Sequence, residues 1–334
     1  MRLFITGGCG FIGSNFILDW INKNRGPLVN VDCLNYAEQL ANLKEIENNL
    51  LYTFIHGNIN HRSLISDTLA YNMPNCVIHF AAESHAINIP HQPEHFLINN
   101  VIGTFNLLEE VLNYWKTLTP DAQQAFRFIH ISTNEVYGEN DKEIVSYQPN
   151  NPYAASKASA DHFVRAYYHT YGLPTITIHT GNIYGPRQYS EKLIPTMLQQ
   201  ALSGQQLTIG NDQNMHDWLY VGDAVAAISL IAEHGVPGEV YNIGGEQERS
   251  NLTLIRTMCE ILEKKIAHPG IDSFESLIQL VQDEANADIC YTANNDKVRS
   301  ELGWNANTSL NEGLDTTISW YLQQWSTNCK KIST

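Results

Sequence analysis

RLFITGGCGFIGSNFILDWIN, residues 2–22, opens the chain with a short apolar run, a cluster of glycines and a longer amphipathic run. The apolar run predicts a buried strand, and the amphipathic run predicts a helix. Glycines between a strand and a helix permit a tight turn, and they let backbone amides approach a pyrophosphate at the positive end of the helix. This order of elements predicts a dinucleotide-binding start of the Rossmann type.

The second apolar run, PLVNVD, ends at Asp32, which lies 19 residues after Gly13. A carboxylate at this place accepts hydrogen bonds from the hydroxyls of the adenosine ribose. Cys33 follows, and no arginine stands beside it to neutralise a 2′-phosphate. The sequence therefore favours NAD over NADP.

Short apolar runs alternate with amphipathic runs up to about Thr180. This alternation predicts an α/β fold with a doubly wound parallel sheet. Beyond Thr180, segments punctuated by proline and glycine predict a smaller, mixed α/β lobe that binds the substrate. We expect an NAD-binding Rossmann domain at residues 1–180 and a mainly substrate-binding lobe at 181–334. Parts of about 217–245 are expected to return to the large domain.

The composition excludes several classes of protein. The 334 residues include 43% hydrophobic residues, and 20 Lys and Arg against 35 Asp and Glu give a formal charge of -15. Such a chain is globular, and its acidity disfavours nucleic acid as a partner. It contains no run of about 18 apolar residues and no secretory leader, so we expect a cytoplasmic protein that does not bind membranes. Its six cysteines are widely spaced, which favours neither a metal site nor a disulfide framework.

One pattern formally resembles a zinc peptidase motif. His91-Gln-Pro-Glu94-His95 matches H-x-x-E-H. Pro93 suits the first turn of the following helix, and a solvated helix start accounts for the polar residues. We therefore expect no metal here.

A second motif carries chemistry. Tyr153-Ala-Ala-Ser-Lys157 begins an amphipathic run, so Tyr153 and Lys157 lie one helical turn apart on one face. An ammonium beside a phenol lowers the pKa of the phenol, which would let the tyrosine act as a base near neutral pH. Thr133, at the end of the apolar run FRFIHIST, can supply a hydroxyl to the same substrate oxygen.

Together with these motifs, the segments HFAAESH, HISTNEVYG, NPYAASKASADHFVRAYYHTYGLP and NIYGPRQYSEKLIP give a chain that resembles the dTDP-glucose 4,6-dehydratases. These are extended short-chain dehydrogenase/reductases, and the resemblance spans nearly the whole chain. It implies that a tyrosine takes the proton of the sugar 4-hydroxyl while a hydride passes from C4 to NAD. A glutamate then removes the C5 proton, an aspartate protonates the departing C6 hydroxyl, and the hydride returns to C6. It also implies a homodimer formed by the helices after Glu94 and after Tyr153.

The resemblance assigns residues to three sets. The expected catalytic set is Thr133, Asn134, Glu135, Tyr153 and Lys157. The expected cofactor contacts are Gly7, Gly10, Phe11, Ile12, Gly13, Asp32, Asn58, Ile59, Ala81, Ala82, Ser84, Tyr153 and Lys157. The expected contacts to a nucleotide-sugar substrate are Ser84, His85, Asn182, Arg187, Glu191, Lys192, His216 and Asn251.

The chain departs from the family pattern around this pocket. Asn134 occupies the place of the acidic aspartate, and an amide cannot donate a proton as a carboxylic acid does. Asn58 replaces an aspartate at the adenine, while His216 and Glu284 replace two arginines that grip the sugar diphosphate. Two alternatives therefore stand beside the dehydratase: an epimerase that uses the same C4 oxidation, and a non-catalytic NAD-binding homologue.

Overall fold

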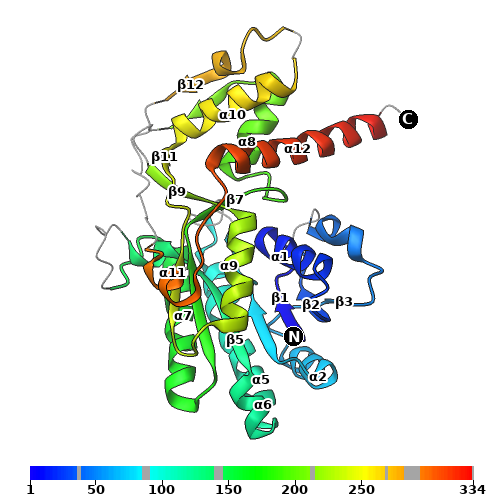
Figure 1. The fold of residues 1–334 in the computed structure, drawn as a ribbon, viewed down its shortest axis with the longest axis vertical. Coiled ribbons are helices and arrows are strands. Elements are labelled where there is room, and N and C mark those ends of the chain that lie inside the picture. Colours follow the sequence, from blue (N-terminus) through cyan, green and yellow to red (C-terminus); the bar gives the residue numbers. More distant parts are fainter. Residues whose placement is uncertain are drawn as a thin grey trace. The chain divides into compact units, whose positions relative to one another are not determined.

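The computed structural model describes residues 1–35, 39–84, 91–138, 146–210, 215–267, 270–281 and 294–332 (Figure 1). The chain forms two compact units. The first comprises Met1–Thr180, Val225–Ile243 and Asn294–Asn305. The second comprises Gly181–Ala224, Gly244–Ala293 and Ala306–Thr334.

A parallel sheet of seven strands, in the order β10-β6-β5-β4-β1-β2-β3, forms the centre of the first unit. This sheet confirms the predicted α/β class with a doubly wound parallel sheet. The strands are β1 (Leu3–Thr6), β2 (Leu28–Asp32), β3 (Tyr52–His56), β4 (Cys76–His79), β5 (Arg127–Thr133), β6 (Thr175–Thr180) and β10 (Val240–Ile243).

Both faces of the sheet are buried. Phe4, Val29 and Phe128 pack with residues of α2, α5 and α7 in one apolar core. Their neighbours Ile5 and Ile129 point to the opposite face, because side chains alternate along a strand, and they are also fully buried. Burial on both faces explains why each strand appears in the sequence as a continuous apolar run.

The first unit also holds most of the helices. They are α1 (Phe11–Asn22), the 3-10 helix η1 (Gln39–Ile46), α2 (Arg62–Asn72), α4 (Pro93–Phe96), the π-helix η2 (Leu97–Ile102), α5 (Gly103–Lys116), α6 (Pro120–Ala125), the 3-10 helix η3 (Asn134–Tyr137), α7 (Pro152–Tyr171), α9 (Val221–His234) and α11 (Asp296–Leu302). The first residues of α9 belong to the second unit.

The second unit has its own apolar core, built on α8, α10 and α12. A mixed sheet in the order β11-β9-β7 and a parallel pair β12-β8 accompany these helices. Its elements are β7 (Asn182–Tyr184), α8 (Leu193–Leu202), β8 (Leu207–Ile209), β9 (Met215–Tyr220), β11 (Glu248–Ser250), α10 (Asn251–Lys265), the 3-10 helix η4 (Phe274–Leu277), β12 (Ile278–Leu280) and α12 (Leu310–Ile332).

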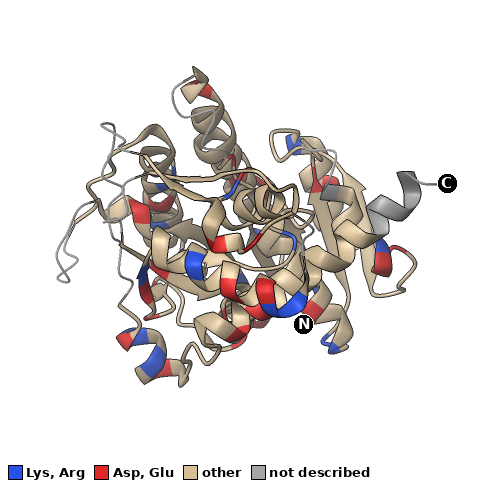
Figure 2. Cartoon of the chain, turned by 90° about the horizontal axis from the view of Figure 1, so that it is seen from above, with Lys and Arg blue, Asp and Glu red and all other residues tan. Residues whose placement is uncertain are grey.

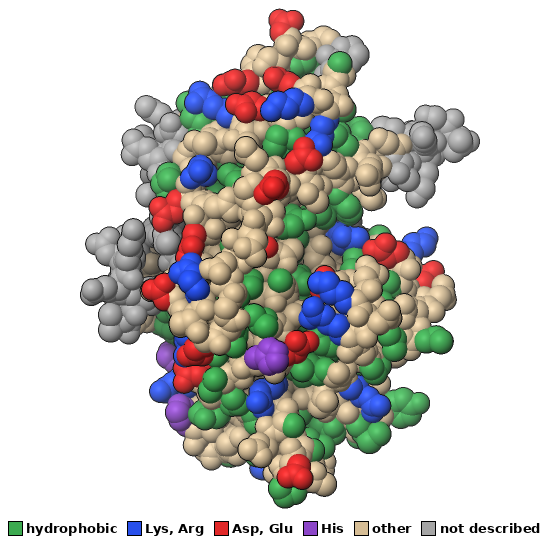
Figure 3. All heavy atoms as spheres, viewed as in Figure 1, with side chains coloured by type: hydrophobic (Ala, Val, Ile, Leu, Met, Phe, Trp, Pro, Cys, Tyr) green, Lys and Arg blue, Asp and Glu red, His purple; other side chains and the backbone are tan. Residues whose placement is uncertain are grey.

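Charged side chains are scattered over the helices and loops (Figure 2). On the face shown in Figure 3, lysines and arginines lie among acidic neighbours and gather into no broad basic surface. Within the described ranges, no helix is both long enough and apolar enough to cross a membrane.

Candidate active site

The carboxyl edge of the parallel sheet brings together the segments that follow β1, β2, β4 and β5. Because these strands are parallel neighbours in the order β5-β4-β1-β2, the residues after Thr6, Asp32, His79 and Thr133 meet at one edge. Ligands of open α/β sheets bind at this edge, where the strand order reverses on either side of β1. The expected cofactor and catalytic residues of the first unit fall on these segments, on the segment after the neighbouring strand β3, or on helices beside them.

The glycine turn between β1 and α1 is closely packed against neighbouring backbone. Gly7 has a φ of +71°, and a Cβ built on it would lie 2.5 Å from the backbone nitrogen of Ala81. A Cβ on Gly13 would lie 2.6 Å from the carbonyl oxygen of Gly7. Gly10 precedes α1, whose first turn has no side-chain cap and no acidic residue. The positive end of α1 therefore presents backbone amides suited to a pyrophosphate.

Asp32, at the end of β2, lies beside this turn. One carboxylate oxygen accepts a hydrogen bond from the backbone amide of Cys9, and the other accepts one from that of Leu34, each at 2.9 Å. Burial raises the pKa of Asp32, and these two hydrogen bonds act in the opposite direction. Each oxygen keeps a second lone pair for a ribose hydroxyl.

The remaining expected cofactor contacts of the first unit lie on the segments after β1, β3 and β4. Phe11 and Ile12 begin α1 and are partly buried. The Oδ1 atom of Asn58 accepts the backbone amide of Asn60 at 2.8 Å, and Ile59 is buried. Ala81, Ala82 and Ser84 follow β4.

Asn100, which is not among the expected site residues, fixes the segment after β4. Its side chain accepts the backbone amide of Glu83 at 2.7 Å and donates to the Glu83 carbonyl at 3.0 Å. Its amide nitrogen also lies 2.8 Å from Oγ of Ser156 on α7. Asn100 is in the π-helix η2, an irregularity that often marks a functional site. The pair of asparagines in the largely apolar run FLINNVIGTF was the available signal.

The N-terminus of α7 holds the expected catalytic pair. Asn151 caps this helix by accepting the backbone amide of Ala154 at 2.8 Å. The Tyr153 ring lies edge-on to the buried Phe96 ring at 5.9 Å, and its phenol is hydrogen-bonded to the Thr133 side chain. Lys157, one turn later, is buried and donates from Nζ to the Ile131 carbonyl on β5 at 2.7 Å.

The structure corrects the expected lowering of the Tyr153 pKa. Burial raises this pKa well above its ordinary value, and the negative charge of Glu135 raises it further. The hydrogen bond from Thr133 acts in the opposite direction but is outweighed. Burial also lowers the pKa of Lys157 to about 8. Helical spacing brought the two side chains to one face, but burial determines the direction of both shifts.

Asn134 and Glu135 follow Thr133 directly, in η3. The Thr133 hydroxyl accepts the backbone amide of Glu135 at 3.2 Å, which fixes the turn out of β5. Oε2 of Glu135 accepts the side-chain amide of Asn151 at 3.3 Å. Asn134 is buried. The five expected catalytic residues thus come from the end of β5, from η3 and from the start of α7, and α7 packs against both other elements.

The expected substrate contacts of the second unit come from several of its elements. Asn182 on β7 and His216 on β9 are joined through Nδ2 and Nδ1 at 2.9 Å. Arg187 has a φ of +69°, and its guanidinium lies over the Trp320 ring of α12, 5.6 Å from the centroid. Lys192 directly precedes α8, Glu191 is exposed, and Asn251 begins α10.

His85, an expected substrate contact, and Glu284, which replaces a family arginine, lie outside the described residues. Among the residues that are described, no group of three or more His, Cys, Asp or Glu side chains could hold a metal ion. His91 and His95 flank the start of α4, where Pro93 occupies the first turn as expected.

Comparison with known proteins extends over almost the whole chain. A family model described as GDP-mannose 4,6 dehydratase matches residues 4–317. A dTDP-glucose 4,6-dehydratase of Escherichia coli is 43% identical over 97% of this chain and 95% of its own length. The crystal structure of a dTDP-glucose 4,6-dehydratase from Bacillus anthracis str. Ames in complex with NAD superposes with a TM-score of 0.84 at 35% identity, covering 98% of both chains. A UDP-glucose 4-epimerase of Thermotoga maritima gives a TM-score of 0.81 at 27% identity, covering 97% of this chain and all of its own.

Proposed function

Because this chain belongs to the 4,6-dehydratase family of extended short-chain dehydrogenase/reductases, we propose that it is a dTDP-glucose 4,6-dehydratase. Such a hydro-lyase oxidises C4 of the sugar, removes water across C5 and C6, and forms a 4-keto-6-deoxy sugar. The observation that carries the proposal is the 43% identity over nearly the full length of a dehydratase of that name. The grouping of Thr133, Glu135, Tyr153 and Lys157 beside one sheet edge supports it.

The first unit fits NAD as its cofactor. The glycine turn leaves no room for a Cβ at Gly7 or Gly13, the first turn of α1 is uncapped by side chains, and Asp32 ends β2 beside them. We propose that these residues hold the pyrophosphate and the adenosine ribose. When bound, NAD supplies the hydride acceptor for C4 and the hydride donor for C6.

Tyr153 is proposed to accept the proton of the sugar 4-hydroxyl. Its raised pKa makes the phenolate scarce but strongly basic, and the Thr133 hydrogen bond favours the phenolate. Lys157, with a pKa of about 8, remains mostly protonated at neutral pH. Its ammonium supplies the positive charge on this face of α7, where we propose that it also holds the cofactor ribose.

Glu135 is proposed to remove the C5 proton, which the C4 ketone makes acidic. The side-chain amide of Asn151 orients its carboxylate. The side-chain amide of Asn134 is too weak an acid to protonate the departing C6 hydroxyl, so we propose that it orients a water that does so. This arrangement implies a slower elimination than a carboxylic acid would give.

The direct test incubates the purified protein with dTDP-glucose and identifies the product by mass and NMR. We expect a product lighter by one water, with a ketone at C4 and a methyl group at C6. Tyr153→Phe, which keeps the ring that packs on Phe96, should abolish its formation. If dTDP-glucose is not consumed, a panel of other nucleotide sugars would test the base and the sugar separately.

Epimerisation is the second candidate because Asn134 cannot act as an acid, and inversion at C4 or C5 requires none at that position. It predicts deuterium exchange at C5, or a changed configuration, without loss of water. A 6-deoxy product would exclude it. If no sugar of the panel produces enzyme-bound NADH, that result would instead support a non-catalytic NAD-binding homologue.

A homodimer is also proposed, through the helices after Glu94 and after Tyr153. Leu97, Ile98 and Ile102 on η2 and Phe163 on α7 are large apolar residues that are 40 to 54% exposed. Replacing Ile98 with Glu should shift the mass measured by light scattering to that of one chain. The control is Leu50→Glu, since Leu50 is a fully exposed apolar residue elsewhere in the same unit. A cytoplasmic location stays a prediction.

A further inference from the structure

A buried carboxylate lies on α7 in the part of the helix that follows Lys157. Asp161 is one helical turn after Lys157 and two turns after Tyr153, so the three residues share one side of the helix. Only 3% of Asp161 is exposed. Carboxylates are almost never buried to this extent unless they are paired. None of the catalytic steps proposed for this site uses the Asp161 carboxylate.

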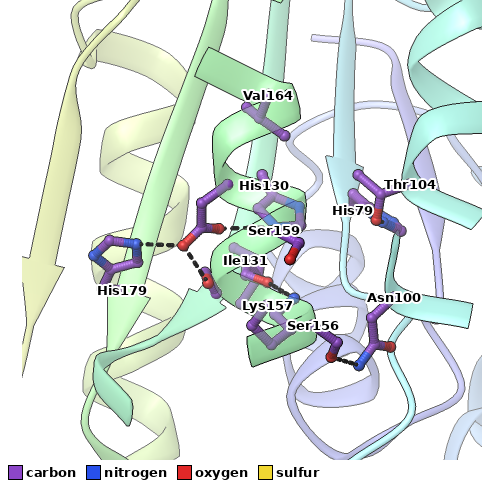
Figure 4. Close-up of polar contacts among 12 residues, drawn as sticks. His79, Asn100, Thr104, His130, Ile131, Ser156, Lys157, Ser159, Val164 and His179 are labelled. Atoms are coloured by element: carbon purple, nitrogen blue, oxygen red, sulfur yellow. Dashed lines mark hydrogen bonds and ion pairs between the residues drawn. The ribbon is translucent and has the colours of Figure 1, made fainter. Parts of the chain in front are cut away.

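The strands under α7 provide the partners of this carboxylate. Oδ2 of Asp161 accepts hydrogen bonds from Oγ of Ser132 at 3.0 Å and from Nε2 of His179 at 2.9 Å. Oδ1 lies 3.2 Å from Nε2 of His130. Figure 4 shows the interactions of His130 and of His179, and the hydrogen bond from Lys157 to Ile131. Asp161 is thus held to β5 by Ser132, the residue directly before Thr133.

Among the described residues, titratable groups of β4, β5, β6, η3 and α7, the last including Tyr153, lie around Asp161 or its partners. On β4 and β5, burial and the Lys157 charge lower the pKa values of His79 and His130, the latter to about 4, so both rings are neutral at pH 7. Burial raises the pKa values of Tyr137 and Tyr147, which stay protonated. The other groups that face this cluster are His179 on β6, Arg165 on α7 near Tyr147, and Glu135 near Tyr153.

The buried Asp161 carboxylate carries a negative charge, which stabilises the positive charge of the buried Lys157 ammonium. Positions four apart on a helix have Cβ atoms about 6 Å apart. The charges lie at the ends of the two side chains, and at an effective dielectric constant of about 20, opposite charges roughly 6 to 12 Å apart change a pKa by about one to two units. Without this partner, the desolvated Lys157 would lose much of its charge at neutral pH. The Asp161 charge raises the pKa of Lys157, whereas burial lowers it.

We propose that Asp161 is a positioning residue of the active site, which keeps Lys157 protonated and, through Ser132, fixes the end of β5 that carries Thr133. The part of this role that concerns catalysis rests on the proposed function. The effect on Lys157 belongs to the folded chain alone, so it can be measured without substrate or cofactor.

The test follows the lysine side chains of the deuterated protein by carbon-13 NMR over a pH series, with Lys157 assigned from the Lys157→Met variant. Lys157 should titrate near pH 8 in the parent, and about one to two units lower in Asp161→Asn. The alkaline limb of kcat/KM should move to lower pH by the same amount. Ser132→Ala is the matched control, because it removes one hydrogen bond and keeps the carboxylate. Its Lys157 should titrate as in the parent.

A Lys157 that titrates at the same pH in the parent and in Asp161→Asn would overturn the proposal. If Asp161→Asn does not fold, Asp161→Glu decides, since it keeps the charge while changing the hydrogen bonds. Lys157 should then titrate within about half a unit of the parent value, and a drop of one unit or more would contradict the charge effect. If Lys157 titrates at lower pH in Asp161→Asn but the parent does not dehydrate dTDP-glucose, the positioning role would be supported and the proposed function refuted. If the parent dehydrates dTDP-glucose but Lys157 titrates at the same pH in the parent and in Asp161→Asn, the proposed function would be supported and the positioning role refuted.

Discussion

Replacing Asn134 with aspartate tests whether the missing acid limits the elimination. Asn134 is 3% exposed and begins η3 directly after Thr133. Aspartate has nearly the same volume as asparagine, so the buried position can accept it without a cavity or a clash. Burial and the adjacent Glu135 charge should both raise the pKa of the new carboxyl group. It would then be partly protonated at neutral pH, as a general acid must be.

The magnitude follows from what a positioned acid contributes. General acid catalysis contributes on the order of 10² to 10⁴ in rate. A water oriented by Asn134 already supplies part of this effect, so we expect kcat for water loss to rise roughly 10-fold to 100-fold, which corresponds to about 1.4 to 2.7 kcal/mol in the barrier.

The assay separates the two halves of the reaction. Steady-state formation of the 4-keto-6-deoxy product measures the complete sequence, and rapid mixing measures how fast enzyme-bound NADH appears. Asn134→Asp should accelerate the first and leave the second nearly unchanged. Asn134→Ala, which can neither donate a proton nor orient a water through an amide, should be slower than the parent. A product rate no higher in Asn134→Asp than in the parent, with unchanged NADH formation, would refute the reasoning.

Three further substitutions test the cofactor turn, a buried histidine and the π-helix. Gly13→Ala places a Cβ 2.6 Å from the Gly7 carbonyl, so calorimetry should show NAD binding at least about 10-fold weaker. Gly303→Ala, at a φ of +70° with open space around it, should lower stability by about 1 kcal/mol and leave NAD affinity unchanged; equal NAD affinity in both variants would contradict the role of the turn. His130 has a pKa lowered to about 4 by burial, below its unfolded value, so its contribution to stability is present above about pH 6.5 and is lost as the pH falls towards 4. The parent should lose about 2 kcal/mol from this group between pH 7 and pH 5, and His130→Gln should show a flatter urea stability profile over that interval; parallel profiles would argue against a neutral His130. Asn100→Leu leaves the Glu83 backbone without its side-chain partner and should lower the free energy of unfolding by about 2 to 4 kcal/mol, whereas a loss below about 0.5 kcal/mol would show that water replaces the amide.

The parts of the fold that the sequence predicted depend on local pattern. Strands buried on both faces appear as continuous apolar runs, and a glycine cluster between such a run and a helix leaves few other conformations. Tyr153 and Lys157 could be paired because one helix carries both at a fixed spacing. Thr133, by contrast, was placed beside them by its position at the end of a strand and by the family resemblance.

What the sequence could not supply are contacts between elements. The asparagines in FLINNVIGTF mark a polar position, but they do not show that Asn100 bonds to Glu83 and Ser156, which lie 17 and 56 residues away. The last segment of the first unit, Asn294–Asn305, likewise follows a long stretch of the other unit. Such pairings are set by packing of the whole chain, and they produce no periodic pattern in the sequence.

The error about Tyr153 shows why geometry on a helix does not determine chemistry. The spacing places the Lys157 ammonium one helical turn from the Tyr153 phenol. Coulomb's law alone then predicts a lowered pKa for Tyr153. In the folded chain the Lys157 ammonium instead donates to the Ile131 carbonyl, 26 residues earlier and on another element. The Glu135 charge, brought close by the turn out of β5, acts on the phenol with the opposite sign, and burial outweighs every pairwise charge. The sign of a pKa shift at a buried site therefore depends on the desolvation and on all the charges that face the group, which include Asp161 here.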